Sequence, residues 1–537
     1  MINQEAALKE IETGRMPHDR RRYPRALSDA PGEIILNGWW PRRLRLPLHV
    51  RDVSATGMGL RVSPLDPLRT ASRAAVRWDI PSAMSPSGSP IRLRVTGTLL
   101  PRGDSGSCGF RFDRLLDEQL REHQARRRKL MAALTAAALA AAISILKTRN
   151  IISFWYDPFW QTYSMLAGFY VLSRIAYAWF YKEPEDHGII KPATVVLPIM
   201  NEERHIEAVI RRLFQARYPA EMLEVIAIDD GSTDGTWAAL QRLAVEFPRL
   251  QIHRFQSHKG KRHAMALGAQ KAAGEILIFM DSDSLVAAES FYRLVQPFHD
   301  SRVGAVAGHT SIIIEPANFI SKMEAVRYFI SQRVMKAAES IFGAVNCCPG
   351  PLSAYRREAV LAVLDEWLNQ RFLGAEATFG DDRSLTNRIL RHYRVVYHSG
   401  ARCSTYAPNT WAAFLKQQLR WKKSWVRETL CTARIMAREH PLAAAPYYAS
   451  ILLTLMSPLV VLRVFLYSPW VMGGAAYLPY LAGLMLVFLL FGVLYYYHTQ
   501  SRYWYYGLVF AVVYSWLLSL QTYYAILTVR QNHWGTR

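Results

Sequence analysis

Short apolar runs alternate with amphipathic segments in the middle of the chain. ATVVLPIMNEERHIEAVIRRLF, residues 193–214, predicts a buried strand, a loop and an amphipathic helix. LEVIAIDDGSTDGTWAALQRLA, residues 223–244, repeats that order, and GEILIFMDSDSLV, residues 274–286, supplies another strand. This β-α-β alternation predicts a parallel sheet whose ligands bind outside the carboxyl ends of the strands. We therefore expect an α/β domain over residues 182–440.

Longer apolar stretches flank this domain. The basic run RRRK directly precedes uncharged residues 130–146, and a Trp/Tyr-rich segment follows at 159–181, so we expect two transmembrane helices within residues 130–181. Arg174, inside the second segment, is expected to snorkel or to line a polar path. The C-terminal region, residues 446–537, has three more apolar stretches, namely 446–468, 470–497 and 503–527.

The third C-terminal stretch allows two placements. If it crosses the bilayer, Arg530 and Arg537 lie outside the cell; if it lies in the interface, they stay inside, as the positive-inside rule favours. We expect the interfacial placement. The first residues lack the apolar core of a signal peptide, so the N-terminus and the α/β domain are expected in the cytoplasm.

The N-terminal part has a different pattern. Residues 33–115 alternate short apolar runs with turns, which predicts a small antiparallel barrel within a domain covering residues 19–116. Residues 1–18 are expected to form a tail, and PSAMSPSGSP, residues 81–90, is the clearest loop.

Charge and cysteine content narrow the partners. The net charge of +22 fits nucleic acid, acidic lipid or phosphorylated substrates. Trp39, Trp40 and Trp78 do not alternate with basic residues along one strand, so a nucleic-acid barrel is not expected. The five cysteines have no zinc-site or disulfide spacing, which indicates reduced thiols.

The predicted strand ends carry carboxylates. Asp229 and Asp230 follow one strand, and Asp281 and Asp283 follow another, at a spacing that can hold a divalent cation against a diphosphate. A lone D-x-D is more often an Asx turn, but the ordered strand exits argue against that interpretation. Lys259, Lys261 and Arg262 cluster around Gly260 before a helix, which suits phosphate, although a solvated basic loop would look similar.

Two later segments add candidate catalytic groups. Asp381 and Asp382 could supply a general base, because repulsion and partial burial raise the proton affinity of one carboxylate; Asp381 could equally cap the following helix. Gln417, Arg420 and Trp421 form Q-x-x-R-W, which by itself resembles an ordinary amphipathic helix.

Taken in order, Asp230, the D-x-D, Gly380-Asp381-Asp382 and Q-x-x-R-W resemble processive family-2 glycosyltransferases of the GT-A fold. Within that group, CCPGPLSAYRRE, GDDRSLTNRIL, QQLRWKKSW and the terminal WGTR are similar to hyaluronan synthases and chitin-oligosaccharide synthases, and the resemblance covers about residues 145–537. Cellulose synthases are less similar, because they typically have Thr-Glu-Asp at residues 380–382 and glycine at Ser424.

The resemblance implies a role for each site residue. Asp230 would hold the uracil or ribose of a UDP-sugar, and Asp281 and Asp283 would bind the phosphates and Mg²⁺ or Mn²⁺. Lys261 and Arg420 would neutralise the leaving diphosphate, Asp382 would deprotonate the acceptor hydroxyl, and Trp421 would stack on the acceptor sugar in an inverting displacement. Cys347, Cys348 and Trp534 would contact substrate, although a buried structural pair of thiols is an equal alternative.

A second resemblance concerns the barrel. Arg21-x-x-x-Arg25, Asp52-x-Ser54-x-x-Gly57 and a closing CGFRF resemble the PilZ domain, a receptor for cyclic di-GMP. Two arginines would grip the phosphates, while Asp52, Ser54 and Gly57 would meet a base edge. The alternatives are a β-turn and a basic patch attracted to anionic lipid.

These features predict a bacterial inner-membrane enzyme that polymerises sugar from a nucleotide sugar into an exported polysaccharide and is activated by cyclic di-GMP. Its expected partners are membrane lipid, the growing polymer and periplasmic or outer-membrane export proteins, and no nucleic acid. Two alternatives are a non-processive transferase that moves one sugar to a lipid carrier and a catalytically silent cyclic di-GMP receptor that scaffolds polysaccharide export.

Overall fold

The computed structural model describes ten stretches of the chain, which divides into two compact units, Met1–Met131 and Ala132–Arg537. The described stretches are residues 26–36, 44–53, 57–62, 73–80, 91–101, 107–114, 116–153, 158–314, 318–472 and 477–531.

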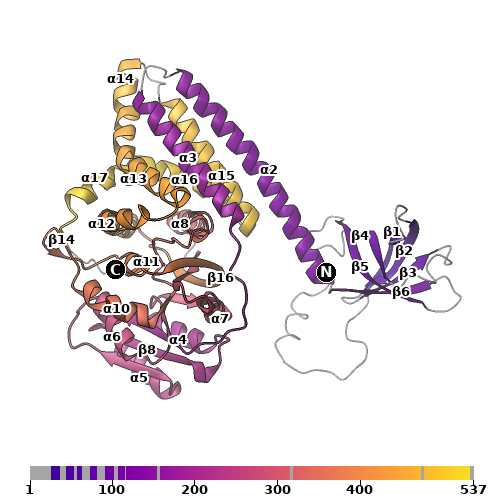
Figure 1. Cartoon of the computed structure of the whole chain (residues 1–537), viewed down its shortest axis with the longest axis horizontal. Helices are drawn as coiled ribbons and strands as arrows, with labels where there is room; N and C mark the ends of the chain where they lie inside the picture. Colours follow the sequence, from indigo (N-terminus) through magenta and orange to yellow (C-terminus); the bar gives the residue numbers. More distant parts are fainter. Residues whose placement is uncertain are drawn as a thin grey trace. The chain divides into compact units, whose positions relative to one another are not determined.

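The first unit contains a closed antiparallel barrel with strand order β1-β2-β3-β6-β5-β4 (Figure 1). Alternate residues fill its core: Val76 and Trp78 of β4, Leu60 of β3 and Phe110 of β6 are buried. The predicted small barrel is therefore confirmed. Its strands are β1 (Ala26–Leu36), β2 (Leu44–Val53), β3 (Gly57–Val62), β4 (Arg73–Ile80), β5 (Ile91–Pro101) and β6 (Ser107–Phe112).

Gly57 begins β3 at a point of close backbone approach. A Cβ atom at this position would lie 2.5 Å from the carbonyl oxygen of Phe110 on the neighbouring strand. Only glycine fits without a shift of the barrel. Packing of the strands is thus one sufficient reason for the glycine of the D-x-S-x-x-G motif.

The second unit is built on an eight-stranded mixed sheet with order β11-β16-β12-β13-β10-β7-β8-β9. The parallel segment predicted from the sequence is confirmed, since β10, β7, β8 and β9 run parallel. The strands are β7 (Ala193–Ile199), β8 (Leu223–Asp229), β9 (Leu250–Arg254), β10 (Ile276–Phe279), β11 (Ser284–Val286), β12 (Val303–Ile313), β13 (Ser353–Arg356) and β16 (Arg394–Tyr406), with a separate pair β14 (Arg371–Phe372) and β15 (Ala375–Glu376).

Helices cover both faces of this sheet, which explains its continuous apolar strands. Val195 of β7 belongs to the core on one face and Val196 to the core on the other. The first face packs against α4 (Ile206–Phe214), α5 (Thr236–Glu246) and α7 (Ser290–Val295). The second face packs against α6 (Lys261–Lys271), α10 (Arg357–Leu368) and α11 (Asp381–Leu390), and short 3₁₀ turns occur at η3 (Ala220–Met222) and η4 (Gln296–His299).

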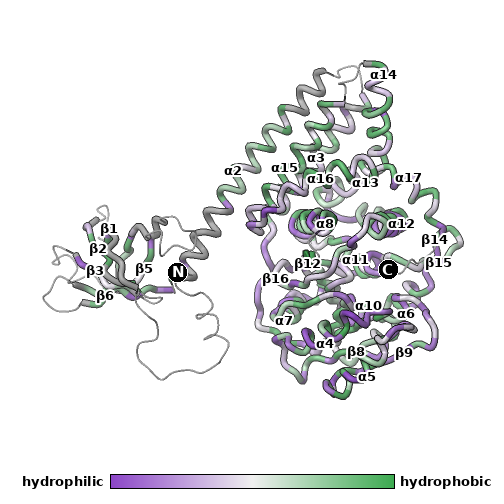
Figure 2. The backbone as a smooth tube through the Cα atoms, turned by 180° about the vertical axis from the view of Figure 1, so that it is seen from behind, coloured by the Kyte–Doolittle hydropathy of each residue, from purple (hydrophilic) through white to green (hydrophobic). Residues whose placement is uncertain are grey.

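Apolar helices gather on one side of the sheet domain, and Figure 2 shows their hydrophobic character along α13, α15 and α16. Three helices of the described chain are long and apolar enough to cross a membrane: Pro441–Val471, Tyr480–Thr499 and Arg502–Leu527. The stretch Lys129–Ile145 is apolar but shorter. The elements are α2 (Leu116–Ser153), α3 (Pro158–Phe180), α13 (Pro441–Leu462), η6 (Arg463–Tyr467), α14 (Ser468–Met472), α15 (Leu478–Thr499), η7 (Arg502–Tyr505), α16 (Tyr506–Val513), η8 (Tyr514–Leu518) and α17 (Ser519–Leu527).

Two helices separate the sheet domain from the apolar helices in both whole-chain views: α8 (Phe319–Phe329) and α12 (Trp411–Met436). The final helical stretch packs along both of them. Val513 and Leu518 share a buried cluster with Met323 of α8 and Phe414 of α12. Further along, Lys422 Nζ donates to Thr522 Oγ1 at 2.8 Å, and Lys423 Nζ donates to the carbonyl of Gln531 at 3.2 Å.

Candidate active site

The carboxyl ends of adjacent parallel strands bring the first group of predicted residues to one edge of the sheet. β8 ends at Asp229 and β10 ends just before Met280 and Asp281, with β7 hydrogen-bonded between the two strands. Loops leaving these strands therefore begin at the same edge. Asp230 and Asp281 both follow strands that end at this edge, as the strand pattern predicts.

Asp230 fixes the loop that precedes α6. Its carboxylate accepts hydrogen bonds from the backbone N–H groups of Lys259 at 2.8 Å and Gly260 at 2.9 Å, and lies 2.9 Å from His258 Nδ1. Gly260 has φ +99°, a value that favours glycine. The carboxylate thus presents a rigid loop, and the N-terminus of α6 with it, to the sheet edge.

Lys261 and Asp281 form an ion pair at the centre of the site. Burial opposes the positive charge of Lys261, but the Asp281 carboxylate outweighs it and raises the pKa of the lysine. A Cβ atom at Gly350 would lie 3.0 Å from Asp281 Oδ2 and 3.2 Å from Lys261 Nζ. The segment Asn346–Gly350, hereafter the loop 346–350, therefore passes directly beside this ion pair.

Asp283, the second carboxylate of the D-x-D, is oriented by the neighbouring strand β16. Thr405 Oγ1 donates to Asp283 Oδ1 at 3.1 Å. Among the described residues, no group of three or more His, Cys, Asp or Glu side chains could hold a metal ion unaided. The two carboxylates of Asp281 and Asp283 suit Mg²⁺ or Mn²⁺, which commonly bind one or two carboxylates together with substrate phosphates.

Asp381 and Asp382 lie in different surroundings at the start of α11. Asp381 Oδ1 accepts from Arg262 Nε at 2.8 Å, and both side chains are buried. Asp382 Oδ1 accepts from the N–H of Arg383 at 2.8 Å, and its Oδ2 lies 3.8 Å from Cys347 Sγ. Of these two aspartates, Asp382 is therefore the one whose carboxylate approaches the loop 346–350, through Cys347.

Gly380, and not Asp381, occupies the N-cap of α11, so the capping role considered for Asp381 is wrong. Gly380 has φ +76°, and a Cβ atom there would lie 1.9 Å from Ser424 Oγ on α12. The left-handed conformation and the close approach both require glycine. The contact brings α11 against α12.

A largely buried polar network connects α11 to α6 and α12. Gln370 accepts from Ser384 Oγ of α11 at 2.7 Å and donates to Glu428 Oε1 of α12 at 2.7 Å. Arg262 also donates to Gln370 at 3.3 Å. The network joins α6 and α12 to α11, the helix that carries Asp382. Sequence reasoning missed Gln370 and Glu428, because no local spacing signals a contact between distant helices.

The Q-x-x-R-W residues lie on α12, as predicted. Trp421 packs against α8: its ring centre is 4.8 Å from the Arg327 guanidinium and 6.3 Å from the Tyr328 ring centre. Burial raises the pKa of Tyr328, and Asp283 and Asp281 add to the increase against the opposing charge of Arg327. Trp421 therefore contacts α8 through both Arg327 and Tyr328. Gln417 and Arg420 share the same turns of α12.

The two cysteines are not activated. Burial, with Asp382 nearby, raises the pKa of Cys347 to about 11, and burial raises the pKa of Cys348 to about 12. Cys348 is fully buried in the core, and its N–H donates to Thr386 Oγ1 at 2.9 Å. Its surroundings match the structural alternative, whereas Cys347 is the thiol that approaches Asp382. Both remain protonated near neutral pH, as expected for contacts and not nucleophiles.

The structure does not describe every predicted site residue. Arg21, Arg25, Ser54 and Trp534 are outside the described residues. The backbone of Asp52 is described: it lies in β2, paired with Gly59 of β3.

Comparison with known proteins identifies the chemistry. Residues 194–364 match the family described as glycosyl transferase family 2. The chain is 26% identical over 387 residues to the hyaluronan synthase of Streptococcus pyogenes, covering 70% of this chain and 90% of the relative. It is 32% identical over 267 residues to an N-acetylglucosaminyltransferase of Rhizobium meliloti (strain 1021), covering 49% and 62%.

A mannosyltransferase from Pyrobaculum calidifontis, solved with GDP-Man and Mn²⁺, is similar over 66% of this chain and 98% of its own, with 23% identity and a TM-score of 0.43. The family match over residues 194–364, together with the carboxylates at the sheet edge, identifies the chain as a glycosyltransferase, and a region of apolar helices follows its catalytic domain.

Proposed function

We propose that this enzyme is a processive polysaccharide synthase of the bacterial inner membrane, which transfers sugar from a cytoplasmic UDP-sugar to the growing polymer and exports the product. The observation that carries the proposal is the convergence of Lys261 and Asp281, Asp382 and the loop 346–350, with Trp421 on a helix next to the apolar region. The similarity to a hyaluronan synthase over most of that relative supports it.

Each group has a chemical task in this proposal. Lys261 and Arg420 neutralise the diphosphate as it leaves, and Asp230 holds the nucleoside. Asp382 removes the proton of the acceptor hydroxyl during a direct, inverting displacement. A Mg²⁺ or Mn²⁺ ion held by Asp281 and Asp283 would stabilise the charge of the departing diphosphate. Trp421 stacks on the acceptor sugar, and Trp534 and the Cys347 segment contact it.

The C-terminal contacts support an interfacial final helix. The last helical stretch packs against α8 and α12 along its length, and its end is bound to Lys422 and Lys423, directly after Trp421. Under this proposal, Gln531 lies on the same side as Lys423 and the catalytic domain. Residues 182–440 would then be cytoplasmic.

We also infer that the N-terminal barrel is a PilZ-like cyclic di-GMP receptor that activates the transferase. The closed six-stranded barrel is compatible with that fold. Arg21 and Arg25 would clamp the phosphates, with Asp52, Ser54 and Gly57 at a base edge.

Sugar incorporation by purified membranes tests the proposal. Labelled UDP-N-acetylglucosamine and UDP-glucuronic acid are supplied singly and together, with and without cyclic di-GMP. A long polymer is expected. A single sugar on an extracted lipid would support a lipid-carrier transferase, and export unchanged in Asp382→Asn cells would support a silent scaffold. Equal activity with and without the dinucleotide would contradict activation by cyclic di-GMP. Arg21→Ala is expected to abolish this activation, and Arg20→Ala is its control.

A further inference from the structure

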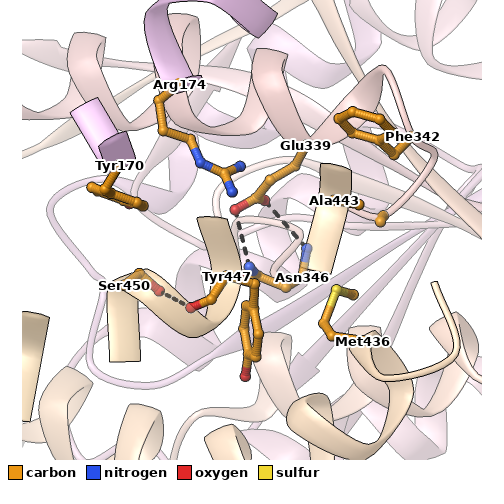
Figure 3. Close-up of a pocket in the computed structure, with 10 residues that line it drawn as sticks. Tyr170, Arg174, Glu339, Phe342, Asn346, Met436, Ala443, Tyr447 and Ser450 are labelled. Carbon is orange, nitrogen blue, oxygen red and sulfur yellow. Dashed lines mark hydrogen bonds between the residues drawn. The ribbon is translucent and has the colours of Figure 1, made fainter. Parts of the chain in front are cut away.

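A small polar cavity lies between α3, α13 and the segment leading to the loop 346–350 (Figure 3). Its volume is about 30 Å³, which leaves room for about two water molecules. The lining residues come from α3, α9 (Ala337–Ser340), the segment after α9, the end of α12 and α13, and the polar ones include Arg174, Glu339, Asn346, Tyr447 and Ser450.

Arg174 and Glu339 face this cavity from opposite elements. Arg174 of α3 is only 5% exposed. Its guanidinium points into the cavity and lies 5.6 Å from the Tyr170 ring centre. Among described residues, Arg174 Nε has no hydrogen-bond partner. Tyr447 and Ser450 already donate their hydroxyl protons to backbone carbonyls. Arg174 and Glu339 are therefore the charged groups that face the cavity.

Glu339 holds the first residue of the loop 346–350. Its Oε1 accepts from Asn346 Nδ2 at 3.0 Å, and its Oε2 lies 3.4 Å from the Asn346 N–H. The next residue, Cys347, carries the thiol that approaches Asp382. Glu339 therefore holds Asn346, the residue directly before the one that contacts Asp382, the candidate base.

Lys336, one helical turn before Glu339, binds the same loop. Its buried ammonium donates to the carbonyl of Cys347. Lys336 ends the π-helical segment η5 (Ile330–Lys336), and such segments often occur at functional sites. The spacing Lys336-x-x-Glu339 puts both side chains on one face. A cation and an anion of one helix thus bind successive residues of the loop.

We propose that Glu339 and Lys336 are positioning residues that hold the loop 346–350 against Asp382, with Arg174 supplying compensating charge to Glu339 across the cavity. The inference rests on the proposed function, because it concerns how the acceptor hydroxyl is aligned for attack. It also makes α3 part of the acceptor site, without direct contact between α3 and the substrate.

Asn346 and Cys347, the end of the loop that Glu339 and Lys336 bind, lie next to Asp382. The proposed nucleotide site is formed instead by Asp230, Lys261 and Asp281. Loosening the grip should therefore misalign the acceptor and leave donor binding intact. Misplacement of reacting groups lowers kcat without a matching rise in KM. A general structural defect would change both, and would also lower the amount of folded protein.

The experiment compares polymer formation with hydrolysis of the donor by water in purified enzyme. Glu339→Ala is expected to lower sugar incorporation about tenfold, while the donor KM and the hydrolysis rate stay within about twofold. Glu339→Gln keeps an acceptor oxygen for Asn346 and should restore much of the rate. Glu358→Ala, an exposed glutamate of α10, is the matched control.

The Arg174 contribution is tested in the same assay. Arg174→Met should lower incorporation in the same selective way, and Arg174→Lys should recover part of it. Equal loss of incorporation and hydrolysis in Glu339→Ala, or an unchanged rate, would overturn the positioning role. The proposed function fails separately, when the unmodified enzyme incorporates no sugar from any UDP-sugar.

Discussion

Arg262 Nε lies 2.8 Å from Asp381 Oδ1, joining the first turn of α6 to the first turn of α11 across 119 positions of sequence. The residue before Arg262 is paired with Asp281, and the residue after Asp381 is the candidate base. One buried ion pair therefore sets the separation between the phosphate side and the acceptor side of the site.

The two aspartates of α11 should respond differently to substitution. Asp382→Asn removes the proton acceptor, so kcat should fall by about a hundredfold to ten-thousandfold with little loss of stability. Asp381→Asn leaves Arg262 buried without its counter-charge, so the melting temperature should fall by about 5 °C or more. Asp365→Asn on α10 serves as a neutral control. Equal kcat losses without a stability difference would contradict this division of roles.

Metal removal should stop transfer reversibly. Because Asp281 and Asp283 supply only two carboxylates, the ion should exchange readily and be held mainly with the diphosphate. Dialysis against a chelator should abolish sugar incorporation, and added Mg²⁺ or Mn²⁺ should restore it. Asp283→Asn should require more metal for half-maximal activity. Full activity in chelator would exclude a metal-dependent reaction.

The buried thiols predict a change in alkaline solution. The pKa values of Cys347 and Cys348 are raised from about 9 to about 11 and about 12, so folding favours the protonated thiols. Their contribution to stability is complete below pH 9 and is lost as the pH rises through the folded values. Melting temperature measured from pH 8 to 11 should fall, and Cys347→Ser should fall less. An identical decline in the variant would contradict the assignment.

Acid should destabilise the sheet domain through His309. Burial, with Arg333 and Arg402 nearby, lowers the pKa of His309 to about 3, and its Nδ1 lies 2.6 Å from Tyr397 Oη. The neutral imidazole stabilises the fold above pH 6.5, and this contribution is lost as the pH falls toward 3. Thermal unfolding between pH 7 and 5 should show the loss. His309→Gln should reduce the slope, and an unchanged slope would point to other groups.

The end of the last helix should be reachable from the cytoplasm. Lys423 of α12 binds the Gln531 carbonyl, so a cysteine introduced by Gln531→Cys should react with a membrane-impermeant maleimide only in inverted vesicles. The variant is made in a background without the native cysteines, provided that this background retains activity. Labelling in intact spheroplasts would show a crossing helix.

Sequence periodicity was sufficient for the barrel and for the parallel strands, because both depend on local patterns of apolar residues. It also located Asp230, Asp281 and Asp382, since strand ends and helix starts are readable signals. It could not find Gln370, Glu428 or the Lys336 and Glu339 grip, because these contacts join helices that are distant in sequence. It offered capping as an alternative role for Asp381, whereas the left-handed Gly380, packed closely against Ser424, takes the N-cap position.

Helix α12 carries three attachments on one rod of 26 residues, about 39 Å long. Trp421 contacts α8, Lys422 and Lys423 bind Thr522 and the Gln531 carbonyl, and Glu428 joins the polar network of α11. A rigid rod cannot move at one attachment alone. A tilt of α12 would therefore shift the contacts of Trp421, Gln531 and Gln370 together.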